Sequence, residues 1–204
     1  MPLLSVKNLS VSFQNNPVVN DISFELSAKK ITALVGQSGS GKSITALAIL
    51  NLLNKAKVLG EINFEGKNLL NLSQKELCKI RGNKIGMVFQ DPNSSLNPLH
   101  KIGKQITEAI TIHYPKTSKK QLNNRLKELL KIVELEAFFN RLDDYPHQLS
   151  GGQKQRIMLA IALANNPKIL IADEPTTALD ISTQNDILNL ILRLRNELEI
   201  AVLF

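Results

Sequence analysis

The chain has 204 residues, 43% of them hydrophobic and 21% charged, so it can bury the core of one ordinary globular domain. This composition disfavours disordered and fibrous classes, and no run of about 18 uncharged apolar residues is present that could span a bilayer. The net charge of +7 would suit nucleic acid or an anionic membrane surface, but the lysines are mostly dispersed. Cys78 is the single cysteine, which excludes an internal disulfide and a cysteine-based metal cluster.

Neither the N-terminal residues nor the lysine-rich segment carries a clear targeting or binding signal. The start, MPLLSVKNLS, lacks the basic, apolar and small-residue regions of a secretory signal, which predicts a protein that stays in the cytoplasm. The lysines crowd only between Lys116 and Lys131, where Glu128 stands among them at helical spacing. This pattern is more typical of a solvated helix face than of a binding patch.

The N-terminal part alternates short apolar runs with turns. Residues 3–13 and 18–26 show near period-2 alternation, which predicts half-buried antiparallel strands, and residues 60–70 form a further hairpin candidate. The continuous apolar run at 31–35 ends in a Gly-rich turn and is followed by a helical pattern. That order is typical of a buried parallel strand leading into a helix.

Helical patterning dominates from residue 91 to about residue 156, which we interpret as a helical insertion. Apolar runs on either side predict strands at 84–90 and 168–173, and an amphipathic helix is expected from about 182 to 198. Repeated strand, helix and strand predict a parallel sheet with right-handed crossovers, and hence an α/β fold.

The sequence GQSGSGKS matches the P-loop pattern GxxxxGK[ST] between an expected strand and an expected helix. Its glycines let backbone N–H groups turn toward a phosphate, and the helix N-terminus adds the positive end of its dipole. Lys42 is expected to reach the β and γ phosphates and Ser43 to bind Mg²⁺, whereas an ordinary glycine turn is the weaker alternative. The residues predicted to surround the phosphates of ATP are Gly36, Gln37, Ser38, Gly39, Ser40, Gly41, Lys42 and Ser43.

A P-loop needs an acidic element to place the metal and the attacking water, and ILIADEP supplies one at the end of an apolar strand. Parallel strands of such folds bring their carboxyl ends to the edge where ligands bind. Asp173 is therefore the candidate Mg²⁺ partner, directly or through water. Glu174, one residue on, is the candidate to orient or deprotonate the water.

A second Ser-Gly-Gly turn opens another expected helix, in LSGGQKQR at 149–156. Ser150 is expected to cap the helix, while Gly151 and Gly152 allow close backbone approach to an anion. Gln153 completes this candidate half-site for phosphate.

Together these motifs resemble the ABC ATPase family, and the resemblance covers essentially the whole chain. It implies a P-loop NTPase fold with a RecA-like parallel core, an N-terminal antiparallel β-subdomain and a helical subdomain. A single nucleotide-binding domain over 1–204 is then expected, with an ATP-binding core at 1–90 and 157–204 and a helical subdomain with the signature at 91–156. In that family two such domains sandwich two ATP molecules, each between the P-loop of one and the signature of the other.

Further site residues are implied by the resemblance alone. Phe13 falls where the family has its adenine-stacking aromatic, although a core Phe is as good an interpretation. Gln90 matches the Q-loop glutamine, which touches metal and water, so the implied catalytic residues are Glu174, Gln90 and Lys42 and the implied metal ligands are Ser43, Gln90 and Asp173. Ala178, Leu179 and Asp180 match the D-loop that bridges the two active sites.

The family's switch histidine is expected about three residues beyond Phe204. The chain is therefore interpreted as a C-terminally truncated fragment, whose own ATPase activity stays open. His100, His113 and His147 all lie in the helical insertion and cannot replace the missing residue.

Several segments are similar to the ATPases of dipeptide, oligopeptide and nickel importers, namely FQDPNSSLNP, YPHQLSGG and IADEPTTALD. Others are similar to the first half of tandem microcin C and peptide importer ATPases. The implied partners are a second nucleotide-binding domain, membrane permease subunits and, indirectly, a substrate-binding protein, at the cytoplasmic face of the inner membrane and with no nucleic acid. Residues 91–99 would form the permease docking loop, with a plain surface loop as the alternative.

Two other functions were weighed against import. A soluble ABC ATPase acting on ribosomes or DNA would suit the net charge, but no long heptad run of the DNA-repair type interrupts the chain. A binding-only regulatory domain is disfavoured because Lys42, Ser43, Asp173 and Glu174 are all present.

Overall fold

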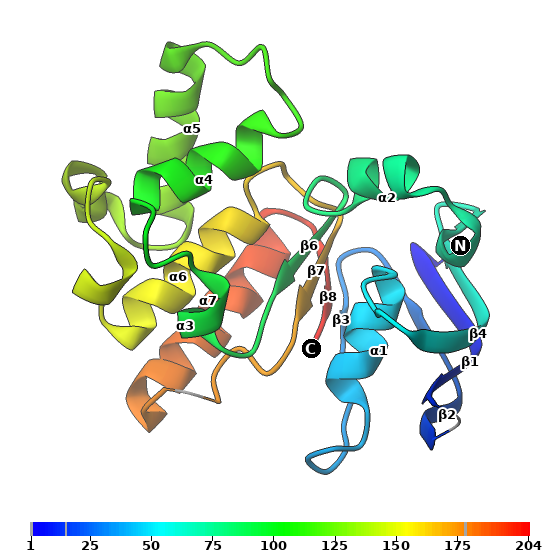
Figure 1. The fold of residues 1–204 in the computed structure, drawn as a ribbon. Coiled ribbons are helices and arrows are strands. Elements are labelled where there is room, and N and C mark those ends of the chain that lie inside the picture. The colour runs from blue at the N-terminus through cyan, green and yellow to red at the C-terminus, as the bar shows by residue number, and fades with distance from the viewer. Residues whose placement is uncertain (1, 15, 178) are drawn as a thin grey trace.

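The computed structural model describes residues 2–14, 16–177 and 179–204, without the side chain of residue 93. Two sheets and a group of helices make up this part of the chain (Figure 1). The strands are β1 (Leu4–Phe13), β2 (Asn16–Leu26), β3 (Ile31–Thr32), β4 (Ala56–Phe64), β5 (Lys67–Asn68), β6 (Ile85–Val88), β7 (Ile169–Ala172) and β8 (Ala201–Leu203). The α-helices are α1 (Lys42–Ile49), α2 (Gln74–Ile80), α3 (Pro92–Ser95), α4 (Ile102–Thr111), α5 (Lys119–Ile132), α6 (Gly151–Ala162) and α7 (Ile181–Glu197).

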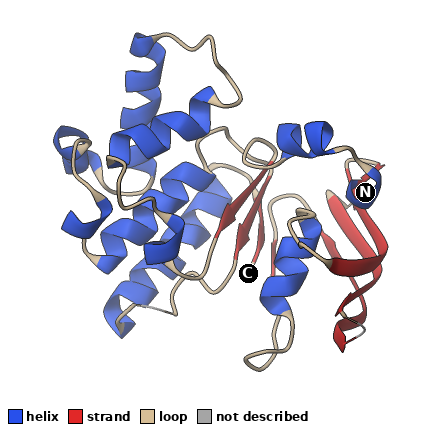
Figure 2. Cartoon of the chain, in the orientation of Figure 1, coloured by secondary structure: helices blue, strands red, loops and turns tan. Residues whose placement is uncertain are grey.

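One sheet is antiparallel, in the order β2-β1-β4-β5, and the other is parallel, in the order β3-β8-β7-β6. The period-2 strands and the hairpin predicted in the N-terminal part are confirmed, as are the parallel strands around β6 and β7. In Figure 2 the antiparallel strands stand at one side and most helices at the other, with the parallel strands between them. The fold is therefore the expected α/β arrangement with an added antiparallel sheet and a helical region.

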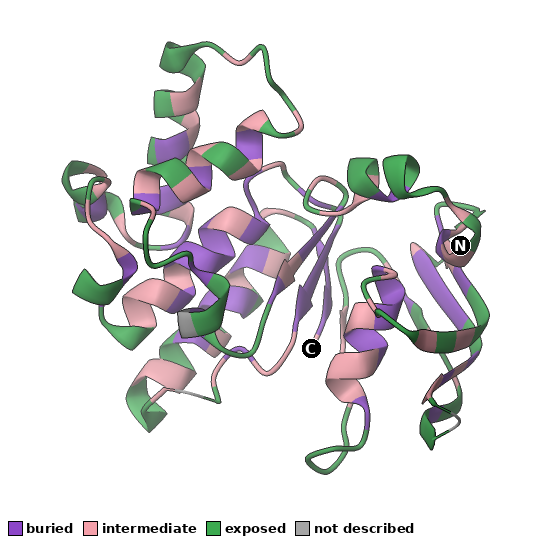
Figure 3. Cartoon of the chain, viewed as in Figure 1, coloured by how far each residue is buried: buried purple, intermediate pink, exposed green. Residues whose placement is uncertain are grey.

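The parallel sheet is buried on both faces because its strands are apolar at consecutive positions. In β7, Leu170 and Ala172 belong to one apolar cluster, which is completed by side chains of α4 to α7. Ile169 and Ile171 belong to a second cluster, shared with α1 and the antiparallel sheet. In Figure 3 the central strands β7 and β8 are buried, whereas β3 at one edge is of intermediate burial. A strand covered on both faces has no need of polar alternation, which explains the continuous apolar run.

The strand predicted at 31–35 is shorter than expected. Only Ile31 and Thr32 form the ladder with β8, and the last hydrogen bond of this pair joins Leu34 N to Phe204 O at 2.7 Å. Val35, the next residue, is 94% exposed, because the chain leaves the sheet there to begin the P-loop.

Helix α2 was not predicted, although its start carries a recognisable signal. Ser73 accepts a hydrogen bond from Glu76 N, and the Glu76 carboxylate accepts one from Ser73 N in return. This reciprocal pair is a capping box, with the pattern Ser-x-x-Glu.

The boundary predicted at residue 156 between the helical subdomain and the ATP-binding core falls inside α6. One helix therefore joins the helical region to the parallel sheet.

Gly86 in β6 lies against the end of α6 with no room for a side chain. A Cβ there would lie 2.3 Å from Ala162 O.

We expect Gly86→Ala to lower the free energy of unfolding by about 1–3 kcal/mol, because the strand must move away from the helix. Urea denaturation measures the change. Gly66→Ala is the comparison: its Cβ would meet nothing within 4 Å, so only the positive φ of +79° opposes it. An equal or smaller loss at Gly86 would contradict the clash.

Candidate active site

The P-loop joins β3 to α1 and is shaped by glycines at left-handed backbone positions. Gly39 and Gly41 have φ of +80° and +93°, and Gly41 is the residue before the first turn of α1. A Cβ on Gly41 would lie 2.9 Å from both Val18 O and Val19 Cγ2 of β2. The loop therefore packs too closely on β2 for a side chain at this position.

Lys42 lies over the P-loop and connects it to β7. Its Nζ donates to Gly36 O at 3.0 Å and to Gln37 O at 3.1 Å. The same nitrogen lies 3.2 Å from Glu174 Oε1. The ammonium group is thus held at the mouth of the loop, next to the carboxylate that follows β7.

Ser43 and Asp173 meet although 130 residues separate them. Ser43 Oγ donates to Asp173 Oδ1 at 2.9 Å. Asp173 N donates to Val88 O at 3.0 Å, so the pairing of β7 with β6 fixes the backbone at this carboxylate. A hydroxyl and a carboxylate side by side provide the oxygen donors that Mg²⁺ prefers.

Burial raises the pKa of Asp173 above its ordinary value, and the nearby charge of Glu174 adds to the rise. The hydrogen bond from Ser43 and the charge of Lys42 oppose it. The ionised form of Asp173 is therefore less favourable here than in water, and a positive ion between Ser43 and Asp173 would offset that cost.

Glu174 is held from three sides. Gln90, just beyond β6, donates from Nε2 to Glu174 Oε2 at 2.8 Å. Thr177 Oγ1 donates to the same oxygen at 3.2 Å, and Lys42 approaches the other oxygen. Glu174 itself has a φ of +44°, which is uncommon for a residue with a side chain. Thr177 was not among the predicted site residues, since a threonine after Glu-Pro carries no signal by itself.

These groups surround one cavity of about 190 Å³. Its lining includes the P-loop residues Ser38, Gly39, Gly41, Lys42 and Ser43 together with Gln90 and Glu174. The P-loop, the Q-loop glutamine and the carboxylates predicted from separate motifs thus lie together at the carboxyl edge of the parallel sheet.

The signature turn begins α6 as predicted. Ser150 Oγ accepts from Gln153 N, and Gln153 Oε1 accepts from Ser150 N, which makes a capping box like that of α2. A Cβ on Gly151 would lie 3.2 Å from Leu179 Cδ2, and one on Gly152 would lie 2.8 Å from Thr183 Cγ2. A side chain at either glycine would therefore have to displace Leu179 or Thr183, because the starts of α6 and α7 touch.

The D-loop residue Asp180 caps α7. Its carboxylate accepts from Ser182 Oγ at 2.6 Å, from Thr183 N at 3.0 Å and from Thr183 Oγ1 at 2.7 Å. These hydrogen bonds, that of Ser182 first, hold the pKa of Asp180 well below its usual value. Leu179 lies against the signature turn, and Ala178 falls outside the described residues.

The signature turn and the P-loop do not meet within the chain. Figure 1 shows the start of α6 and the start of α1 well separated, on either side of the parallel sheet. Phe13 is partly buried at the end of β1 and packs against the core shared with α1. This packing agrees with the interpretation of Phe13 as a core residue and leaves adenine stacking untested.

A scan against family models matches residues 19–177 to the model described as ABC transporter. The chain belongs to the ABC transporter family. Across the described residues of this ABC domain, no helix is long and apolar enough to cross a membrane.

The curated relatives of this ABC domain are ATP-binding proteins. It is 47% identical over 99% of its length to the uncharacterized ABC transporter ATP-binding protein YejF of Escherichia coli, and covers 39% of that protein. It is 45% identical to a putative peptide import ATP-binding protein of Brucella melitensis and 46% identical to the oligopeptide transport protein OppD of Bacillus subtilis, with 99% of the chain covered. It covers 62% and 58% of these two, so it spans about two to three fifths of the relatives' length.

Solved structures confirm the P-loop NTPase fold of an ABC cassette. A dimeric post-hydrolysis state of the cassette MJ0796 bound to ADP and Pi matches with a TM-score of 0.81 and 34% identity, over 98% of this chain and 86% of that one. The cbiO1 protein of Clostridium perfringens matches with a TM-score of 0.83 and 29% identity, over 99% and 77%.

The raised pKa of Asp173 predicts that removing its charge stabilises the domain. The unfolded carboxyl ionises near 3.8, so as pH rises through the higher folded pKa the folded state loses stability. We expect Asp173→Asn, whose amide oxygen can still accept from Ser43, to raise the free energy of unfolding at pH 7. The gain should shrink as pH falls toward 3.8, because the Asp173 carboxyl of the folded parent is then protonated and as neutral as the asparagine of the variant. Urea denaturation across pH tests this, with exposed Asp186→Asn as control; a loss at pH 7 would contradict it.

Proposed function

We propose that this ABC domain binds ATP with Mg²⁺ and hydrolyses it between two cassettes, and that this reaction drives peptide import. The observation that supports the reaction best is the contact of Glu174 with both Lys42 and Gln90 beside the P-loop. A base, a phosphate-binding cation and a polar amide are then within reach of one another, which is what attack of water on a phosphate requires.

The site residues suggest an order of events. Phosphate oxygens compete with Glu174 for the Lys42 ammonium, so binding of ATP draws Lys42 away from the carboxylate. Glu174 is then free to accept a proton from a water molecule oriented with the help of Gln90. The water oxygen bonds to the γ-phosphorus while the bond to the ADP oxygen breaks, so ATP and water become ADP and phosphate. Ser43 and Asp173 would hold Mg²⁺, which neutralises charge on the phosphates when bound.

The second cassette is proposed because the start of α6, which carries the signature turn, lies well apart from the start of α1 in the same chain (Figure 1). A capped helix N-terminus that begins with two glycines can bind a phosphate. Because the P-loop of the same chain lies apart from it, that phosphate would belong to a nucleotide held by another molecule. The dimeric cassette bound to ADP and Pi is similar over nearly the whole chain, which supports this arrangement.

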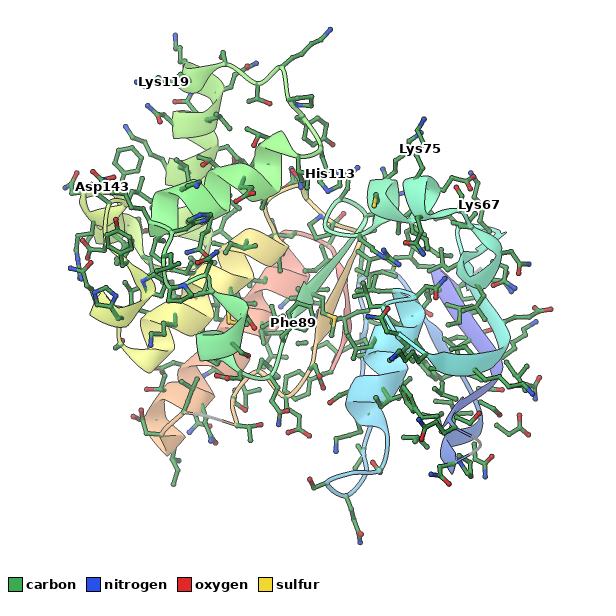
Figure 4. All side chains as sticks on the ribbon, in the orientation of Figure 1. Lys67, Lys75, Phe89, His113, Lys119 and Asp143 are labelled. Atoms are coloured by element: carbon green, nitrogen blue, oxygen red, sulfur yellow. The ribbon has the colours of Figure 1, made fainter. Side chains whose placement is uncertain are left out.

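Import of peptides is supported by the names of the relatives and by the subfamily segments in the sequence. Membrane permeases, a substrate-binding protein and a peripheral position at the cytoplasmic face of the membrane follow from that proposal. Residues 91–99 are the proposed docking loop: Leu99 is 81% exposed, and Figure 4 shows Phe89 on the segment that leads into it. Co-purification of a permease with the full-length protein would support import, and co-sedimentation with ribosomes would favour the alternative.

Glu174→Gln tests the proposed base. In the full-length protein we expect ATP binding to persist and a closed pair of cassettes to accumulate, while turnover falls at least about a hundredfold. The amide keeps the shape and the bond from Gln90 but accepts no proton. Phosphate release and nucleotide binding are the two measurements. Turnover equal to that of the parent would remove Glu174 from this role.

Ser150→Arg tests whether the signature acts on the nucleotide of the other cassette. The long cation would fill the space before α6, so we expect the closed pair to be lost while each cassette still binds ATP. Titration with a fluorescent ATP analogue and light scattering distinguish the two effects. Weaker ATP binding by the separated cassette would mean that Ser150 contacts nucleotide within its own chain.

A further inference from the structure

The C-terminus of α5 meets α6 and α7 at a single carboxylate, Glu134. Arg156 of α6 donates from Nη1 to Glu134 Oε2 at 2.6 Å and to Val133 O at 3.0 Å. Arg193 of α7 donates from Nη2 to Ile132 O at 2.9 Å and lies 3.1 Å from Glu134 Oε1. Each arginine therefore binds one carboxylate oxygen and one terminal carbonyl of α5, where the helix dipole favours positive charge.

Glu134 occupies a backbone position that suits glycine better. Its φ is +57°, and the hydrogen bonds Glu134 N to Lys131 O and Leu135 N to Leu130 O close α5 in a Schellman motif. A residue with a side chain is strained there, and such strain persists where surrounding contacts over-determine it. The two arginines supply those contacts. The Arg156 side chain is 16% exposed and that of Glu134 is 46% exposed, so solvent screens part of this attraction.

The same two helices carry the two turns that face a second cassette. Arg156 follows Gly152 by one turn of α6, and Asp180 caps the start of α7. The first turns of the two helices touch through Gly152 and Thr183. Helix α6 is thus fixed on α7 at two places, by glycine contacts at its start and by Glu134 one turn later. The tilt of α6 relative to α7 therefore determines the direction in which the signature turn points.

We propose that Glu134, through Arg156 and Arg193, is a positioning residue that aims the signature turn at the nucleotide of the other cassette. This inference rests on the proposed function. Glu134 touches no P-loop residue in the contacts described here, so its loss should leave ATP binding by a single cassette unchanged. Without the carboxylate, the two guanidinium groups line one hollow with Asp186, and Glu197 lies 3.8 Å from Arg193 Nε. Arg156 and Arg193 then lose the partner that joins them, which loosens α6 on α7.

The experiment uses the full-length protein with Glu174→Gln, in which ATP held between cassettes is retained through rapid gel filtration. Adding Glu134→Gly removes the carboxylate and also relieves the backbone strain. We expect retained ATP to fall about threefold to tenfold. The melting temperature should stay close to that of the parent, because the strain relieved and the ion pairs lost oppose each other. Glu134→Gln, with the same shape but no charge, should lower retention as well.

Two measurements separate positioning from a merely structural role. ATP affinity is measured with Ser150→Arg added, where no closed pair forms, and should not change. Glu136→Gln, an exposed acidic residue two positions on, is the control and should retain ATP like the parent. Unchanged retention in both Glu134 variants would overturn the proposal, as would a parallel fall in retention, ATP affinity and melting temperature. No retention in the Glu174→Gln parent would instead refute the proposed function, and the positioning role with it.

Discussion

Burial of β7 on both faces is the constraint on which the site depends. Leu170 and Ala172 point into one apolar cluster and Ile169 and Ile171 into the other, so a shift of one residue would exchange the two sets. The register of β7 is therefore strongly determined, and with it the place where the strand ends. Asp173 is the first residue past that end, and its N–H still pairs with Val88 O. Hydrophobic packing in the interior thus sets the position of a carboxylate at the surface of the site.

Around this fixed point the polar groups are mutually dependent. Lys42 has two carbonyl partners and one carboxylate partner, and Glu174 has Lys42, Gln90 and Thr177. These groups come from three segments: Lys42 from the P-loop, Gln90 from the end of β6, and Glu174 and Thr177 from the turn after β7. A ligand that takes one partner must rearrange the others, which couples occupancy of the P-loop to the segment that leads into the helical region.

Much of this arrangement could be predicted from the sequence, and the exceptions have physical causes. The P-loop was predicted from its glycine pattern, Asp173 and Glu174 from their place after an apolar strand, and Gln90 from the family resemblance. The structure brings the P-loop, Gln90 and Glu174 to one cavity, and Asp173 contacts Ser43 at its edge. The short β3 was not foreseen, since apolar character does not reveal where a strand loses its partner. Helix α2 was missed although its capping box was readable, and the Glu134 contacts could not be found because long-range ion pairs leave no local pattern. The roles of Phe13 and of the signature residues stay predictions, because they concern ligands and a second cassette.

The close approach of Gly86 to Ala162 gives α6 the mechanics of a lever. Its C-terminal end is pressed against β6, the strand that leads to Gln90, while its N-terminal end carries Ser150. A helix of this length spans about 18 Å, so a tilt of about 10° around the C-terminal end would move the first turn by about 3 Å once its contacts with α7 are broken. That displacement equals one hydrogen-bond length. In the proposed pair of cassettes, a small shift of β6 beside one nucleotide would then be enlarged at the signature turn that faces the other.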